Sequence, residues 1–365
     1  MPLPSRRDRD DLRRRLAVWL AGKLPPDAAP EISALSIPET NGLSSETLIF
    51  DAAWSEEGAR RTRKYVARMS PEMDDYPVFP SYDLALQYRC LRLVGEHTSV
   101  PVPRAPWLET DAAHLGSPFF VMEHVPGIVP PDMPPYIFGS WLTEATPAER
   151  ARLERASTEV LAKLHALDPS RADVSFLERP AYGTTPLDQH LGYQRWYYEW
   201  AKGDEDFPII ERTFAWLDAH RPEEPEATVV NWGDARIGNM LYRDFTPVAV
   251  LDWEMATLGA PEVDVAWMLV IHRFFADLIV GTDMPGTPGF LERDTVAKTY
   301  AELSGRTLRN LAFYEVFAAL RYGIVMIRTS TRMIAAGDMP APAEPEQKVM
   351  NRGMLEKMLD GSYWA

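Results

Sequence analysis

The segment from Asn231 to Trp267 limits the possible folds of this chain more than any other, because polar side chains recur there at fixed intervals around short apolar runs. Asn239 follows Asp234 by five residues, and Asp252 follows Asn239 by thirteen, directly after the run PVAVL. The runs ATVVNW, MLYR and PVAVLDW carry the β-branched and aromatic residues that are typical of strands. We therefore predict a small hairpin that gathers Asp234, Asn239 and Asp252.

These residue types suit phosphoryl transfer. One carboxylate must accept or orient the proton of the attacking hydroxyl, and oxygen ligands must hold Mg²⁺ against the phosphates of ATP. Asp234 is the predicted base, whereas Asn239 and Asp252 are predicted metal ligands. Asp and Asn also favour turns, but their joint spacing with Asp252 argues against a simple turn. Glu254 is assigned to the metal, with a surface ion pair as the alternative, and Asp264 is predicted to cap a helix or brace the loop.

The same segment resembles the aminoglycoside phosphotransferase and choline kinase-like family. The resemblance rests on Gly233-Asp234, on Asn239, on the Asp-Trp-Glu triplet that starts at Asp252, and on the Gly-x-Pro-x-x-Asp segment that starts at Gly259. It implies an α/β (α+β) chain with a protein-kinase-like bilobal fold. The expected N-lobe is an antiparallel sheet plus a helix, and the expected C-lobe is mostly helical with a small catalytic hairpin.

The resemblance, which runs from about Glu31 to at least Trp267, also suggests domain boundaries. Residues 31–125 are expected to form the ATP-binding N-lobe, and residues 126–365 the catalytic and substrate-binding C-lobe. Residues 1–30 are expected to form an amphipathic helix and a linker. A signal peptide is a weaker interpretation of this stretch, because acidic residues stand among its arginines.

Local patterns predict several elements. Residues 45–53 and 64–69 are expected to form a hairpin around the polar turn SEEGARR, followed by a helix that Ser81 caps and Gly95 ends. Thr146-Pro147-Ala148-Glu149 has the pattern of a capping box with proline at the first helical position.

By the resemblance, nucleotide contacts fall in the N-lobe. Ser44, Ser45 and Thr47 lie in the turn that would cover the phosphates, and Arg68 occupies the strand position of a phosphate-binding cation. The stretch FFVMEHVPG resembles the interlobe hinge, where the backbone would bind adenine through the carbonyl of Glu123 and the amide of Val125.

Two residues depart from the family pattern. Trp232 replaces the histidine that precedes Gly-Asp, and an indole can donate a hydrogen bond but cannot accept one. Gln87 stands where a glutamate is expected to pair with the strand cation, although Asp83 one turn earlier could substitute. These departures motivate an alternative, a nucleotide-binding pseudoenzyme.

The acceptor site is harder to predict. The aromatic cluster from Tyr193 to Trp200 starts a predicted helix, and core packing is its default role. Trp196, Tyr197 and Trp200 are the candidates for a substrate wall.

Composition limits the partners. The 365 residues carry a net charge of −15, which argues against binding driven by nucleic-acid phosphates. The only cysteine, Cys90, excludes an intrachain disulfide and fits a reducing cytoplasm, and no run is long enough for a membrane span. The oligomeric state is left open.

The sequence thus predicts an ATP- and Mg²⁺-dependent phosphotransferase that acts on a hydroxyl of a small molecule. The acceptor could be an aminoglycoside, a macrolide, an amino alcohol or a hydroxyacyl-CoA thioester. A protein kinase is the least favoured alternative.

Overall fold

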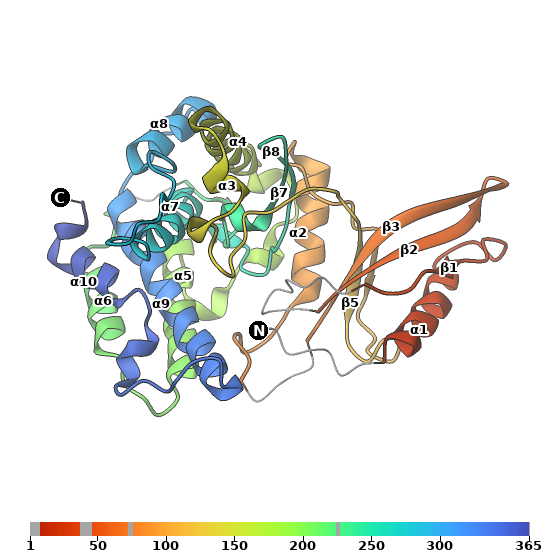
Figure 1. Cartoon of the computed structure of the whole chain (residues 1–365), viewed down its shortest axis with the longest axis horizontal. Helices are drawn as coiled ribbons and strands as arrows, with labels where there is room; N and C mark the ends of the chain where they lie inside the picture. The colour runs from red at the N-terminus through yellow and green to blue at the C-terminus, as the bar shows by residue number, and fades with distance from the viewer. Residues whose placement is uncertain (1–7, 37–45, 72–75, 224–226, 365) are drawn as a thin grey trace. The chain divides into compact units, whose positions relative to one another are not determined.

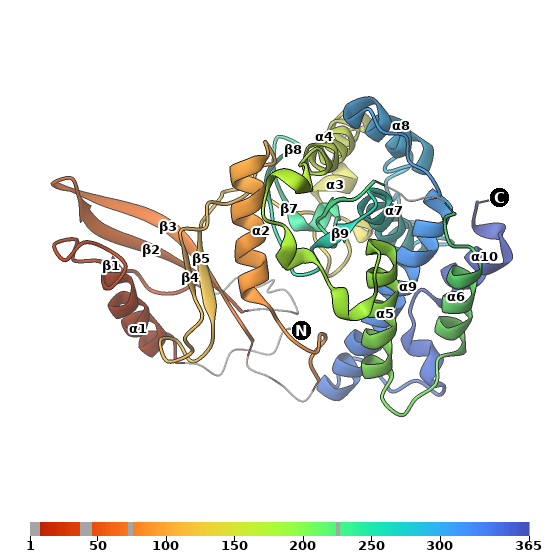
Figure 2. The same cartoon turned by 180° about the vertical axis from the view of Figure 1, so that it is seen from behind.

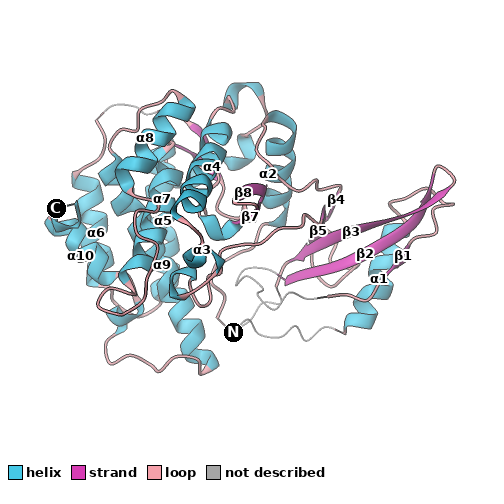
Figure 3. Cartoon of the chain, turned by 45° about the horizontal axis from the view of Figure 1, so that its top comes forward, coloured by secondary structure: helices cyan, strands magenta, loops and turns pink. Residues whose placement is uncertain are grey.

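A computed structural model describes residues 8–36, 46–71, 76–223 and 227–364 (Figure 1). It divides into two units, residues 1–92 with 103–126 and residues 93–102 with 127–365. Strands dominate the first unit and helices the second, as the colouring in Figure 3 shows.

The first unit contains a five-stranded antiparallel sheet with the order β1-β2-β3-β5-β4. Its strands are β1 (Glu31–Ile32), β2 (Glu46–Glu56), β3 (Ala59–Met69), β4 (Trp107–Glu109) and β5 (Phe119–Glu123). The predicted hairpin is β2–β3, but its turn is only Glu57-Gly58. Both residues have positive φ, 52° and 78°, as a tight two-residue hairpin turn requires, so most of SEEGARR extends the strands.

Helix α1 (Arg9–Ala21) is the predicted N-terminal helix. Leu12, Leu16 and Trp19 recur on one face and are buried in the same hydrophobic core as residues of the sheet. The Trp19 ring meets Phe119 edge to face at 4.7 Å, and its Nε1 donates to Glu109 at 2.9 Å. This apolar stripe fixes the helix to the first unit.

Helix α2 (Leu84–His97) begins in the first unit, and its last residues belong to the second. Its N-terminal cap is Asp83 and not Ser81, since the Asp83 carboxylate accepts from the Leu86 amide at 2.9 Å. Gly95 does not end the helix, which continues for two more residues.

The second unit is built mainly of helices (Figure 2). They are α3 (Trp141–Glu144), α4 (Pro147–His165), α5 (Pro186–Lys202), α6 (Pro208–Ala219), α7 (Glu262–Asp277), α8 (Arg293–Ser304), α9 (Leu311–Ala336) and α10 (Arg352–Asp360). The capping box at Thr146 is confirmed. Helix α5 starts before the aromatic cluster, because Thr185 forms a capping box with Asp188.

Two short antiparallel pairs lie in this unit: β6 (Val229–Asn231) with β9 (Thr257–Gly259), and β7 (Met240–Arg243) with β8 (Thr246–Val250). The predicted strands around Asp234 are therefore present. Across the described ranges, no helix combines the length and the apolar character needed to cross a bilayer.

Candidate active site

The loop between β6 and β7 carries Asp234 and is closely packed. Gly233 has φ of +88°, and a Cβ at this position would lie 2.0 Å from the carbonyl oxygen of Met255. Only glycine meets both constraints without strain. The residue before the predicted base therefore has a steric reason to be glycine.

The Asp234 carboxylate is held from three directions. Oδ1 accepts from the Trp267 indole at 2.7 Å, and Oδ2 accepts from the Asn239 amide at 2.6 Å. The Nε of Arg236 lies 3.2 Å from both oxygens. With 8% of its surface exposed, Asp234 is held in one orientation in which it could still accept a proton.

Asp264 braces this loop from helix α7. One of its oxygens accepts from the Trp232 amide at 2.7 Å, and the other accepts from the Gly233 amide at 2.8 Å. His165 Nε2 lies 3.1 Å from the same carboxylate, and Tyr300 contacts the other ring nitrogen of His165. Of the two roles predicted for Asp264, the structure shows the brace.

Trp232 joins the loop to the end of β8. Its indole Nε1 lies 2.8 Å from the carbonyl oxygen of Leu251 and 3.1 Å from that of Asp252. An indole needs only acceptors here, so the inability to accept a hydrogen bond is no handicap. The departure from histidine therefore leaves an ordered loop.

The predicted metal residues approach each other through the backbone. The Leu251 amide donates to the Asn239 carbonyl at 2.9 Å, and Asp252 follows with φ of +60°. Because the side-chain nitrogen of Asn239 is used by Asp234, its Oδ1 is left as an acceptor. One amide oxygen and one carboxylate fit Mg²⁺, which binds few protein ligands and takes the rest from water and phosphates.

Glu254 lies half-buried two residues beyond Asp252, and its metal role remains a prediction. In the described portion of the chain, no three His, Cys, Asp or Glu side chains come close enough to hold a metal by themselves.

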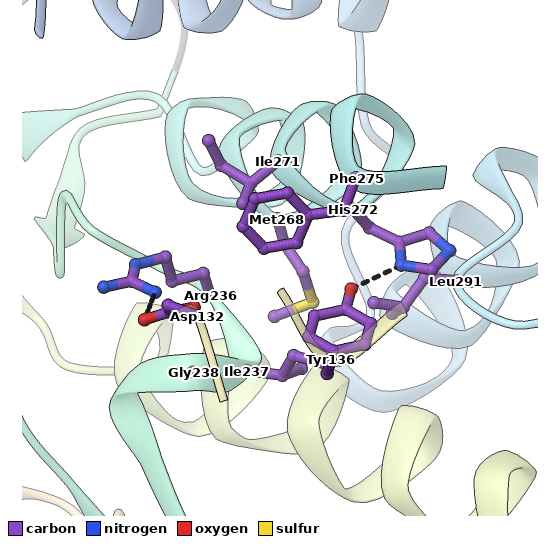
Figure 4. Close-up of a pocket in the computed structure, with 10 residues that line it drawn as sticks. All are labelled: Asp132, Tyr136, Arg236, Ile237, Gly238, Met268, Ile271, His272, Phe275 and Leu291. Atoms are coloured by element: carbon purple, nitrogen blue, oxygen red, sulfur yellow. Dashed lines mark hydrogen bonds and ion pairs between the residues drawn. The ribbon is translucent and has the colours of Figure 1, made fainter. Parts of the chain in front are cut away.

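Arg236 is a site residue that the sequence reasoning missed. Its guanidinium bridges Asp234 and Asp132, which is 104 residues away in the chain. Figure 4 shows the contact between Arg236 and Asp132. Burial by itself lowers the pKa of Arg236, but Asp234 and Asp132 raise it above its ordinary value. The adjacent cavity of about 10 Å³ has room for no more than one water.

The predicted nucleotide residues belong to the first unit. Arg68 pairs with Thr47 across β2 and β3 and donates to its hydroxyl at 3.3 Å. The Val125 amide follows Glu123 at the end of β5 and has no hydrogen-bond partner among the residues described. Ser44 and Ser45 lie outside the described residues.

The three aromatic residues predicted to form a substrate wall on helix α5 differ in their exposure. Tyr197 is 2% exposed and belongs to the core, whereas Trp196 is 41% exposed. Trp200 is half-buried under the guanidinium of Arg328, 4.4 Å from its ring. Their role toward an acceptor remains a prediction.

The similar solved structures are phosphotransferases. A proposed aminoglycoside phosphotransferase from Ralstonia eutropha superposes with a TM-score of 0.66 and 23% identity, over 96% of this chain and 98% of that one. The macrolide 2′-phosphotransferase MphH from Brachybacterium faecium gives 0.56 and 18%, over 92% and 97%. At these identities the likeness establishes the fold, and the predicted kinase-like α+β architecture is confirmed.

Curated relatives carry longer chains. Acyl-CoA dehydrogenase family member 10 of Mus musculus is 25% identical over 79% of this chain but 26% of its own length. Probable acyl-CoA dehydrogenase IBR3 of Arabidopsis thaliana is 28% identical over 64% of this chain and 29% of its own. The chain thus spans between a quarter and a third of these two relatives.

The family assignment rests on a match over most of the chain. The model of the Phosphotransferase enzyme family matches residues 50–313, which include strands β3, β4 and β5 of the sheet, the loop around Asp234 and the brace on helix α7. This chain belongs to the Phosphotransferase enzyme family.

Proposed function

We propose that this protein transfers the γ-phosphoryl group of ATP to a hydroxyl of a small molecule, with Mg²⁺ as cofactor. The observation that carries the proposal is the Asp234 carboxylate, oriented by Trp267, Arg236 and Asn239. The Asn239 carbonyl in turn accepts from the amide of Leu251, the residue before Asp252. Family membership supports the phosphotransferase class. A neighbouring structure, APH(4)-Ia, is a ternary complex with ADP and hygromycin B, which supports ATP as donor.

In this reaction Asp234 accepts the proton of the acceptor hydroxyl. The acceptor oxygen forms its bond to the γ-phosphorus as the bond from that phosphorus to the bridging oxygen of ADP breaks, and ADP leaves with the electron pair. The Trp267 and Asn239 hydrogen bonds aim the carboxylate so that it can receive the proton.

Asn239 Oδ1 and the Asp252 carboxylate would hold Mg²⁺, which when bound neutralises charge on the phosphates. Glu254 would support this set. Arg68 would bind phosphate oxygens, and the backbone at Glu123 and Val125 would bind adenine. These roles assign nucleotide binding to residues 31–125 and catalysis to residues 126–365, and the single buried cysteine agrees with a cytoplasmic location.

The test is ADP release with Mg²⁺ across a panel of aminoglycosides, macrolides, amino alcohols and hydroxyacyl-CoA thioesters. The thioesters are included because the curated relatives are named as acyl-CoA dehydrogenase family members. Turnover that depends on the acceptor and is lost in Asp234→Ala supports the proposal. Tight ATP binding with no stimulating acceptor would favour the pseudoenzyme.

The metal role is tested separately with Asp252→Ala. Loss of a carboxylate ligand should abolish Mg²⁺-dependent ATP binding, measured by calorimetry with and without Mg²⁺. Unchanged affinity for ATP in the presence of Mg²⁺ would remove Asp252 from the metal site.

A further inference from the structure

Arg321 is a buried cation beside the catalytic loop with unused donors. It lies on helix α9, is 3% exposed, and donates from Nη2 to the Gly233 carbonyl at 2.9 Å. Within the described ranges its Nε and Nη1 have no hydrogen-bond partner. Its guanidinium lies 4.5 Å from the Trp267 ring, which satisfies neither nitrogen. Buried donors of this kind are rare and call for a partner.

A second arginine, Arg179, is only partly buried. It precedes helix α5, lies 4.0 Å over the Tyr193 ring, and makes one long hydrogen bond of 3.5 Å to the Ala256 carbonyl. No carboxylate among the described residues pairs with it, and burial lowers its pKa. The Met255 backbone packs against Gly233, so Arg321 on helix α9 and Arg179 in the segment before helix α5 contact neighbouring parts of this region, the carbonyls of Gly233 and Ala256.

The positive charge of Arg179 disfavours the charged form of Arg321. Burial lowers the pKa of Arg321 to about 10, Asp264 and Asp234 oppose that shift, and Arg179 adds to it. Both carboxylates already accept hydrogen bonds from the loop. Asp264 and Asp234 offset part of the cost of burying Arg321, but among the described residues neither forms an ion pair with it, so an anion bound to both arginines would lower that cost further.

A purely structural role for Arg321 would explain its bond to Gly233 but not its two unused nitrogens. It would not explain why Arg179 approaches the same loop without a carboxylate. Guanidinium groups bind carboxylates and phosphates through two parallel hydrogen bonds, which matches the donors left over here.

We infer that Arg179 and Arg321, hereafter the arginine pair, bind an anionic group of the phosphate acceptor, so that the acceptor is a hydroxylated carboxylate or phosphate and not a polycation. This inference rests on the proposed function and narrows its acceptor class. The acceptor hydroxyl is phosphorylated by the step already described, while the anionic group remains unchanged on the arginine pair.

The experiment compares straight-chain hydroxy acids of increasing length, each with the diol of the same carbon skeleton. The two members of a pair offer the same hydroxyl and differ in one carboxylate. We expect the best acid to exceed its diol in kcat/KM by about tenfold or more, mainly through KM.

Three variants test whether the arginine pair causes the preference for the hydroxy acid over the diol. Arg179→Gln and Arg321→Met should reduce the ratio of acid to diol efficiency to near one, and Arg321→Lys should retain part of it. Arg155→Gln is the control, because Arg155 is exposed and pairs with Glu302 on the surface of the same unit. If Arg321→Met does not fold, Arg179→Gln and Arg321→Lys still decide the question.

A second measurement does not need turnover. The hydroxy acids and inorganic phosphate should raise the Tm of the wild type without ATP, and should do so less in Arg179→Gln. Equal use of acids and diols by an active enzyme would overturn the inference while leaving the proposed function intact. If no acceptor stimulates ADP release, the proposed function fails, and anion-dependent Tm shifts alone then support or overturn the anion site.

Discussion

The loop around Asp234 and the arginine pair share one unit but differ in how their polar groups are satisfied. In the loop, the carboxylates of Asp234 and Asp264 accept from protein donors on both oxygens. In the arginine pair, Nε and Nη1 of Arg321 have no hydrogen-bond partner among the residues that the structure describes, and the Arg179 side chain has one long hydrogen bond there.

The loop around Asp234 is ordered before any ligand binds, whereas the arginine pair is expected to find its partners in a bound ligand. A base that must receive a proton works best when its orientation is set before the reaction, since no reorganisation is then needed. A recognition group must instead keep donors free until the ligand arrives, which leaves the unliganded state less stable. The following predictions test whether the two regions differ in this way.

The largest effect is expected from Asp234→Ala. Removing the proton acceptor should lower kcat by about 10²–10⁴-fold, the usual contribution of general base catalysis. Affinity for ATP with Mg²⁺ should change little, as measured by calorimetry. Turnover within a few-fold of the wild type would show that the loop is not preorganised around this carboxylate.

Asp264→Ala should destabilise the protein by about 2–5 kcal/mol, because it leaves the amides of Trp232 and Gly233 buried without acceptors. Urea unfolding measures this loss. Ser330→Ala, which removes a single hydroxyl bond to the Lys348 carbonyl, is a control expected to lose only about 1 kcal/mol. A loss no larger than in the control would contradict the brace.

His190, whose pKa the charges of Arg321 and Arg179 help to lower, should make the free energy of unfolding depend on pH. Burial, and then the charges of Arg321 and Arg179, lower its pKa from 6.5 to about 3. The folded protein therefore holds His190 neutral, so the stability present above pH 6.5 is lost as the pH falls toward 3.

Below pH 6.5, the contribution of His190 changes the free energy of unfolding by about 1.4 kcal/mol per pH unit. In His190→Gln, urea unfolding between pH 6.5 and 4.5 should show a pH dependence that is weaker by this amount. Identical slopes in the two proteins would mean that His190 takes up its proton in the folded state as well.

The smallest effect is expected from Arg179→Met without ligand. It removes a partly buried cation that has no ion-pair partner in the described part of the chain and keeps the apolar stem over Tyr193, so the free energy of unfolding should stay within about 1 kcal/mol or rise. A loss as large as that of Asp264→Ala would show that Arg179 already has its partner inside the protein.

Local patterns predicted the features whose causes lie within a few residues. The capping box at Thr146 and the strands around Asp234 needed only spacing and side-chain type. The start of α2 was misplaced because Ser81 and Asp83 are both good caps, and the chain uses the one whose carboxylate reaches the Leu86 amide. The cap at Thr185 could have been predicted from the sequence in the same way, but the prediction for this helix missed it.

Contacts between residues far apart in the chain could not be predicted from the sequence. Arg236 stands two residues after Asp234, yet nothing local indicates that Asp132 will hold its other side. The arginine pair combines helix α9 with the segment before helix α5, and only the folded chain brings Arg179 and Arg321 to the neighbouring carbonyls of Ala256 and Gly233.

By itself, the sequence determined which residues could carry the chemistry, because a short hairpin brings Asp234, Asn239 and Asp252 together through local backbone geometry. The tertiary structure decided which groups are paired and which are left with unused donors. That depends on burial and on contacts between distant segments, as with Asp264 and His165, which are 99 residues apart. A charged side chain acquires its role only when its surroundings remove water and supply or withhold a partner.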